Sequence, residues 1–361
     1  MLPELRKDPL SGRWVIVAPG RATRPQDVEA AASGAHGLRH CPFCPGGEAD
    51  TPGEVLAVRE TGTPANGPGW RVRVVPNKYP AVENLPEEIS LPTSHIHSAS
   101  RPHPSPLPKG EGADSADSEP NKTAEQFQPG RGVHEVIIES PRHLHSNTEQ
   151  TPEELREVLW AYRYRMGMLL LSGQWRYGLI FKNVGFAAGA SLEHLHSQLV
   201  ALPIVPAAIE ETLHATANFQ QRHVQCYYCD LLRRELADGF RIVAETEGFV
   251  ALCPFAGRFA YETWIIPNRH GAHFSALLDG ELPGLAEMLL LVLKKLESAL
   301  DKPAYNFAIR TAPFDRRADE HYHWHVEIFP RVTRLAGFEL STDFYINVVR
   351  PEDAAETLRK A

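Results

Sequence analysis

Cysteine and methionine are scarce in this chain of 361 residues, which has five of the first and four of the second. Four of the five cysteines fall in two Cys-x-x-Cys pairs. This usage fits metal binding in a reducing compartment better than a disulfide framework, so we predict a cytoplasmic protein. The fifth, Cys253, lies in an apolar stretch and is predicted to be an ordinary core residue.

Long apolar runs and basic runs are also missing. No stretch of 18 apolar residues predicts a membrane span, and residues 1–14 lack the apolar segment of a signal peptide. The net charge is −8, and Lys and Arg are scattered, which argues against binding to a nucleic-acid backbone. We therefore expect no membrane and no nucleic-acid partner. The length predicts two domains or one duplicated unit.

The sequence does contain a motif of cysteine and histidine residues that occurs twice. Each copy has a Cys-x-x-Cys pair, a single histidine and a His-x-His run: Cys41, Cys44, His143 and His194-Leu-His196-Ser-Gln198, then Cys226, Cys229, His270 and His323-Trp-His325-Val-Glu327. The single histidine and the His-x-His run lie 51 residues apart in the first copy and 53 in the second. This repetition indicates duplicated metal sites.

The pattern around the motifs predicts an α+β fold made of two similar units, 1–205 and 206–361. Each unit should be an antiparallel sheet with a long helix packed across it, and its last strand should carry the His-x-His run. Residues 98–130 are rich in proline, serine and charge, and are predicted to be a disordered insertion. The expected helices are 151–172 and 279–300, and the expected strands include 70–75, 134–138, 177–181, 249–253, 261–266 and 305–309.

Two thiolates and two imidazoles complete a tetrahedral zinc site, and four protein ligands leave no open position. We therefore predict that the zinc is structural. The ligands predicted for the first site are Cys41, Cys44, His143 and His194. Those predicted for the second site are Cys226, Cys229, His270 and His323. In the second site the sequence leaves open whether His321 replaces His323, and whether zinc or iron is bound.

His196 lies two residues after a predicted zinc ligand, on the same strand face as His194 and Gln198. It follows a Gly/Ser-rich segment, 185–191, of the kind that lets backbone N–H groups approach phosphate oxygens. An imidazole held by one nitrogen can present the other as a nucleophile. The alternative is a buried polar residue or a loose metal ligand.

The second copy should be non-catalytic. His325 occupies the place of His196, but Glu327 replaces the glutamine, and a carboxylate there would repel a phosphate. No Gly/Ser-rich segment precedes His323.

The chain resembles the galactose-1-phosphate uridylyltransferase family of the histidine-triad superfamily. The motifs that carry the resemblance are 8–17, 21–25, the first Cys-x-x-Cys pair, Pro76-Asn-Lys-Tyr-Pro80, Ser140-Pro-Arg-His143 and 183–198. The resemblance implies that His196 attacks the α-phosphate of a nucleotide sugar and forms a covalent nucleotidyl-histidine. It implies a dimer, and a C-terminal segment that helps to bind the hexose phosphate. The residues that it assigns to substrate are Arg21, Arg24, Asn183, Gly189, Ser191, Gln198, Phe338 and Glu339.

Departures from the family pattern bear on the substrate. The second Cys-x-x-Cys pair, Pro267-Asn-Arg-His270 and the C-terminal motifs are closer to the ADP-glucose phosphorylase-like members, which use phosphate as acceptor. We predict a nucleotidyltransferase that acts on a nucleotide sugar and a hexose 1-phosphate, of the UDP-glucose:galactose-1-phosphate uridylyltransferase type. The alternative is a nucleotide-sugar (ADP-glucose) phosphorylase that uses phosphate as acceptor. A non-enzymatic zinc or nucleotide-binding module is a further alternative, but it would not need the pair His196 and Gln198.

Overall fold

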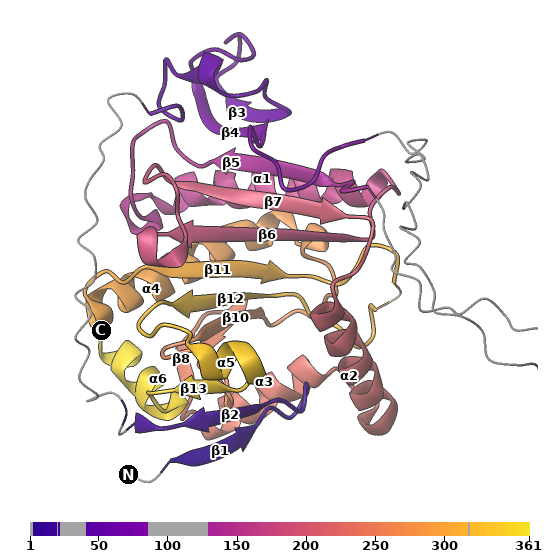
Figure 1. Ribbon diagram of the computed structural model, residues 1–361, viewed down its shortest axis with the longest axis vertical. Helices are drawn as coiled ribbons and strands as arrows, with labels where there is room; N and C mark the ends of the chain where they lie inside the picture. The colour runs from indigo at the N-terminus through magenta and orange to yellow at the C-terminus, as the bar shows by residue number, and fades with distance from the viewer. Residues whose placement is uncertain (1–2, 20, 22–40, 86–128, 317) are drawn as a thin grey trace, which may run out of the picture.

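The computed structural model describes residues 3–19, 21, 41–85, 129–316 and 318–361 (Figure 1). Ten of the described strands form one antiparallel sheet. Their order across the sheet is β3 (Leu56–Arg59), β4 (Trp70–Pro76), β5 (Val133–Ile138), β7 (His196–Leu202), β6 (Tyr177–Val184), β11 (Tyr305–Arg310), β12 (His325–Pro330), β10 (Thr263–Pro267), β9 (Phe249–Leu252) and β8 (Ile242–Glu245).

The strand order on one side of this sheet mirrors the order on the other. The central strands β6 and β11 come from the two copies and pair antiparallel, with Tyr305 opposite Val184. Moving outward, β7 corresponds to β12, β5 to β10, β4 to β9 and β3 to β8. The predicted α+β fold with an antiparallel sheet is confirmed, and the two copies are halves of a single sheet. The proposed division at residue 205 falls between the end of β7 and the start of α2 (Ala207–His223).

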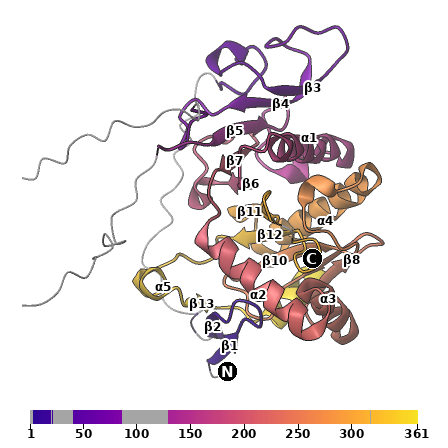
Figure 2. The ribbon, with the colours of Figure 1, turned by 90° about the vertical axis from the view of Figure 1, so that its right-hand side faces the viewer.

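Two long helices, α1 (Pro152–Leu171) and α4 (Leu282–Leu300), contact each other on one face of the sheet (Figure 2). Both were predicted from the sequence. α1 begins where expected because the Thr151 hydroxyl accepts a bond from the Glu154 backbone N–H, and the Glu154 carboxylate accepts one from the Thr151 N–H. The six predicted strands are confirmed to within about three residues at each end.

One hydrophobic cluster joins the halves beneath these helices. It contains Leu159 and Ile180 from the first copy together with Leu289 and Ile309 from the second, all almost fully buried. Cys253 belongs to the same cluster and is 1% exposed, as predicted. Burial of this shared apolar surface stabilises both halves together. Because β6 and β11 pair with each other, neither is left as an open sheet edge.

A smaller three-stranded sheet lies at the end of the molecule opposite β3 (Figure 1). It consists of β1 (Glu4–Lys7), β2 (Trp14–Val17) and β13 (Tyr345–Asn347), with β13 parallel to β2. The chain start therefore packs with the second copy. The remaining helices are α3 (Tyr227–Asp238), α5 (Gly337–Thr342) and α6 (Pro351–Lys360). None of the described helices has the length and apolar character needed to cross a membrane.

Candidate functional site

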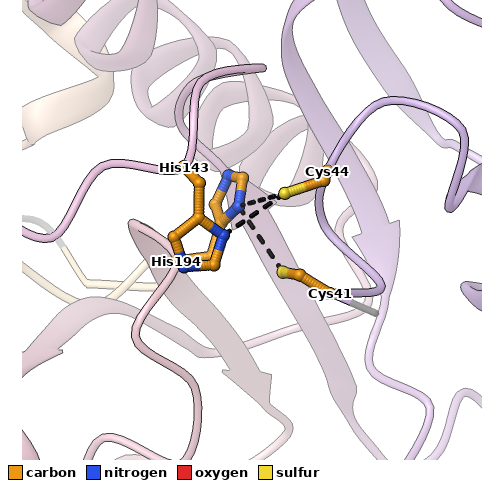
Figure 3. Close-up of side chains that lie close together, drawn as sticks. All are labelled: Cys41, Cys44, His143 and His194. Carbon is orange, nitrogen blue, oxygen red and sulfur yellow. Dashed lines mark hydrogen bonds between the residues drawn. The ribbon is translucent and has the colours of Figure 1, made fainter. Parts of the chain in front are cut away.

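The four predicted ligands of the first metal site come together (Figure 3). Nδ1 of His194 lies 3.6 Å from Sγ of Cys41 and 3.5 Å from Sγ of Cys44. Nδ1 of His143 lies 3.3 Å from Sγ of Cys44. A tetrahedral zinc with bonds of about 2.3 Å to sulfur and 2.0 Å to nitrogen sets these atoms roughly 3.5 Å apart. The donor set and its spacing therefore fit zinc.

The tautomer of His194 supports the same conclusion. Its Nε2 donates a hydrogen bond of 2.8 Å to the carbonyl oxygen of Ser140, so the lone pair is on Nδ1, which faces the sulfurs. Burial and the neighbouring Cys41 raise the pKa of the Cys44 thiol to about 11. Binding of a zinc ion here would therefore release protons from the thiols.

The first Cys-x-x-Cys pair lies in a tight turn that a glycine makes possible. The N–H of Cys44 donates to the carbonyl oxygen of Cys41, and the N–H of Gly47 donates to that of Cys44. A Cβ at position 47 would lie 3.0 Å from the Cys41 oxygen and 3.1 Å from the Cys44 oxygen. Glycine therefore lets the chain fold back closely enough for both sulfurs to face the histidines.

The second cluster is assembled in the same way. Sγ of Cys229 lies 3.4 Å from Nδ1 of His270 and 3.6 Å from Nδ1 of His323, and Cys226 completes the group. His321 does not take part, because its Nδ1 is 2.9 Å from the hydroxyl of Thr216. Of the two histidines that the sequence left open, His323 is the one whose ring lies in the cluster.

His196 is buried, and its ring orientation is determined by the backbone. Nδ1 donates a hydrogen bond of 2.8 Å to the carbonyl oxygen of His194, so the neutral ring carries its lone pair on Nε2. Among the described residues, Nε2 makes no hydrogen bond. Burial lowers the pKa of His196, which favours this neutral form. A neutral imidazole with a free Nε2 can act as a nucleophile or a base.

One detail of the prediction is wrong. The strands that should carry the whole His-x-His run begin at its second histidine, at His196 in β7 and at His325 in β12. His194 and His323 lie just before them, where their side chains turn into the metal clusters.

Gln198 and Asn183 lie on the sheet face that carries His196. Gln198 is two residues along β7, and the register that pairs it with Phe181 sets Asn183 opposite His196. The Asn306 amide nitrogen donates to Asn183 Oδ1 at 2.7 Å and to the carbonyl oxygen of Ala188 at 2.8 Å. Asn306 thereby holds the 185–191 loop against β6.

The loop itself depends on glycine. Gly185 and Gly189 have φ angles of 81° and 85°, which side-chain-bearing residues rarely adopt. Gly189 and Ser191 are exposed, and a Cβ at Gly189 would lie 3.9 Å from the Asn183 amide nitrogen. The predicted substrate residues Asn183 and Gly189 are thus brought together beside β7.

A buried polar network that the sequence analysis missed lies on the opposite face of β7. Nζ of Lys182 is 2.5 Å from a carboxylate oxygen of Glu139, and both side chains are fully buried. Ser197 and Tyr162 donate to the other oxygen of Glu139. Burial opposes the charge on Glu139, but the Lys182 ammonium and the hydroxyls hold the pKa of its carboxyl below the usual value. Alternation along the strands 177–184 and 196–202 is the signal that would have placed Lys182 and Ser197 in the core.

The second copy has apolar residues where the first has this network. The strand register places Pro267, Ile309 and Val326 at the positions of Glu139, Lys182 and Ser197. The fold of one half therefore does not require the network.

On the face of the second copy that corresponds to the His196 face, ion pairs join the side chains to one another. Arg310 stands at the place of Asn183, and its Nε lies 2.8 Å from a carboxylate oxygen of Glu327, which replaces Gln198. Arg258 bonds the same oxygen of Glu327. Nε2 of His325 lies 3.5 Å from Glu327. The carboxylate of Glu327 thus stands beside His325 where the first copy has an amide, and the absence of catalysis in the second copy stays a prediction.

Other predicted substrate residues lie elsewhere in the chain. Arg21 is exposed and follows β2. Phe338 and Glu339 lie on α5, near β13 and β2 and away from β7 in Figure 1. Arg24 and residues 98–128 of the predicted insertion lie outside the described residues.

The sequence of this chain is similar to those of known proteins over most of its length. A family model described as a domain of unknown function (DUF4921) matches residues 111–361. ADP-glucose phosphorylase of Arabidopsis thaliana is 33% identical over 362 residues, which cover 99% of this chain and 93% of that protein. Galactose-1-phosphate uridylyltransferase of Thermotoga maritima is 29% identical over 370 residues, covering 99% and 98%. The chain belongs to the galactose-1-phosphate uridylyltransferase family.

The structural likeness to this family extends over the whole chain. The crystal structure of the Arabidopsis thaliana ADP-glucose phosphorylase with bound ADP-glucose superposes with a TM-score of 0.78 at 32% identity. It covers 100% of this chain and 99% of that one. The predicted resemblance to the uridylyltransferase family, with likeness to its ADP-glucose phosphorylase members, is therefore confirmed.

Proposed function

We propose that this protein transfers a nucleoside monophosphate between a nucleotide sugar and a hexose 1-phosphate through a covalent intermediate on His196. The observation that carries the proposal is the hydrogen bond from His196 Nδ1 to the His194 carbonyl, which leaves Nε2 as the free nucleophile. Nε2 would form a bond to the α-phosphorus, and the bond from that phosphorus to the sugar phosphate oxygen would break. A phosphate oxygen of the acceptor then attacks the same phosphorus and the N–P bond breaks, which regenerates His196.

The surrounding groups support this chemistry. Gln198 and Asn183 share the face of His196, and amide groups there can donate hydrogen bonds to phosphate oxygens as negative charge develops. The exposed loop with Gly189 and Ser191 offers backbone N–H groups and a hydroxyl to the same phosphate. Zinc on the Cys41 cluster would hold His194, and through its carbonyl the ring of His196, without touching the substrate.

A phosphorylase is the second form of the same reaction. In that form the nucleotide on His196 is AMP and the acceptor is inorganic phosphate. It is favoured by the identity of 33% and the TM-score of 0.78 with the Arabidopsis thaliana ADP-glucose phosphorylase. The two forms of the reaction share the nucleophile and differ in the nucleobase of the transferred nucleotide and in the acceptor.

We further propose that the protein acts as a homodimer whose active site takes residues from both chains. Within one chain, α5 with Phe338 and Glu339 lies away from β7. Arg21 likewise lies beside the small sheet. A second copy could bring these predicted substrate residues to His196.

The experiment is intact-protein mass spectrometry after parallel incubation with UDP-glucose and ADP-glucose, without acceptor. A uridylyl adduct that is absent in His196→Ala supports uridylyl transfer, and an adenylyl adduct alone supports the phosphorylase. Metal content of His196→Ala, measured by mass spectrometry of the released ions, should equal that of wild type. Metal-replete protein that forms no adduct with either sugar would favour the non-enzymatic module.

A further inference from the structure

His134 connects Gln198 to the turn that follows β4. Its Nε2 lies 2.8 Å from Oε1 of Gln198, and its Nδ1 lies 3.0 Å from the backbone nitrogen of Ala81. The carbonyl of His134 also accepts a bond from the N–H of Asn77. His134 on β5 thus contacts both Gln198 and the turn that contains the Pro76-Asn-Lys-Tyr-Pro80 segment.

The backbone contact determines which nitrogen of His134 carries the proton. A backbone N–H can only donate, so Ala81 requires a lone pair on Nδ1, and the proton of the neutral ring is on Nε2. Nε2 therefore donates, and Oε1 of Gln198 accepts. The amide nitrogen of Asn77, 3.1 Å from the same Nε2, is a donor and cannot accept, while its Oδ1 is used by the Tyr79 N–H.

This contact sets the orientation of the Gln198 amide. With the oxygen bound to His134, the amide nitrogen faces away from that contact and has no hydrogen-bond partner among the described residues. Its two N–H groups remain available on the face of His196. A flipped amide would present its oxygen to the phosphate, where two acceptors repel each other.

The second copy provides an internal comparison. The strand register places Glu262 at the position of His134 and Glu327 at the position of Gln198. Arg258 bonds both carboxylates, so no amide needs to be oriented there. The histidine and glutamine pair occurs only in the half that carries the proposed nucleophile.

We propose that His134 is a positioning residue that holds the Gln198 amide with its N–H groups toward the transferred phosphate. The inference rests on the proposed nucleotidyl transfer through His196. His134 itself does not touch the substrate; it acts on the rate through Gln198.

Two substitutions of His134 distinguish its hydrogen bond to Gln198 from its hydrogen bond to Ala81. His134→Asn places an oxygen where Nδ1 was and can still accept from Ala81, but it loses the donor to Gln198. His134→Gln places an amide nitrogen near Nε2 and can still donate to Gln198. His214→Asn, on the exposed surface of α2, is the matched control.

The test is the single-turnover rate of adduct formation on the full-length, zinc-loaded protein, with whichever of UDP-glucose or ADP-glucose labels wild type. We expect Gln198→Ala to slow the step about a hundredfold and His134→Asn about tenfold, with the apparent Kd changed less than about threefold. His134→Gln should lose less rate than His134→Asn. In the Gln198→Ala background, His134→Asn should slow the reaction by less than about twofold.

If His134→Asn slows the reaction equally in wild type and in Gln198→Ala, the inference is overturned, because the residue would then act through the turn and not through Gln198. No slowing in either background would overturn it as well. The tautomer is measured separately by long-range ¹H–¹⁵N spectra of histidine-labelled protein, assigned with His134→Gln. A proton on Nε2 is expected, and a proton on Nδ1 contradicts the inference even if no nucleotide sugar labels the protein.

Discussion

Nδ1 of His196 donates a hydrogen bond to the carbonyl oxygen of His194, so the backbone of a predicted zinc ligand orients the ring of the proposed nucleophile. His194 is in turn held by the Ser140 carbonyl through Nε2 and faces the two sulfurs through Nδ1. The metal cluster and the reactive nitrogen are thereby parts of one connected unit.

Loss of the first metal site should therefore lower activity as well as stability. Cys41→Ser is expected to lose about one zinc per chain, to lower the melting temperature and to slow adduct formation tenfold or more. Zinc content, thermal unfolding and the adduct rate are the measurements. Cys253→Ala is the control for loss of a cysteine, because Cys253 lies in the core and should leave the zinc content unchanged. Full zinc content in Cys41→Ser would remove the first site.

The second metal site should matter for stability more than for chemistry. Cys229→Ser and His323→Ala are expected to lose the second metal and to keep the adduct rate within about threefold at temperatures where the protein is folded. His321→Ala should keep the metal, since its ring contacts Thr216. Metal loss in His321→Ala with retention in His323→Ala would reverse the assignment.

Breaking the buried ion pair beneath β7 should lower the free energy of unfolding strongly. Replacing the whole network with apolar residues should lower it much less. Lys182→Met leaves the fully buried Glu139 carboxylate without its cation and should cost about 3–5 kcal/mol of unfolding free energy. A fourfold variant should recover most of this loss, because the second copy has apolar residues at three of these positions. Its substitutions are Glu139→Leu, Lys182→Ile, Ser197→Val and Tyr162→Phe.

Denaturant unfolding measures both variants. A fourfold variant as unstable as Lys182→Met would show that the network is needed for folding of this half. Zinc content, measured in parallel, should stay at the wild-type value in the fourfold variant, because none of the four residues is a predicted ligand.

Subunit mixing tests the proposed composite site. His196→Ala lacks the nucleophile, and Glu339→Ala lacks a residue on α5 that a second chain would supply. If each site takes one residue from each chain, a mixed dimer contains one intact site, and an equal mixture should recover about a quarter of the wild-type activity. Steady-state transfer assays before and after exchange of subunits give the measurement, with light scattering to establish the dimer. Activity that does not rise on mixing would place both residues in the site of one chain.

Much of the fold could be predicted from local pattern. The Thr-Pro-Glu-Glu start signal places α1, because its capping contacts involve neighbouring residues only. The strand that begins at Trp70 follows from alternation of apolar residues. That the two copies share one sheet could not be predicted, because pairing of β6 with β11 depends on edges that are far apart in the sequence.

The sequence by itself predicted which Cys and His residues gather in two clusters, because repeated spacing of Cys and His limits which of them can meet, and it singled out His196 as the proposed nucleophile. The tertiary structure alone decided between His321 and His323, and placed Glu139 with Lys182 and His134 with Gln198. These choices depend on distances across strands and on which ring nitrogen carries a proton. Both are set by packing between segments that are remote in the chain.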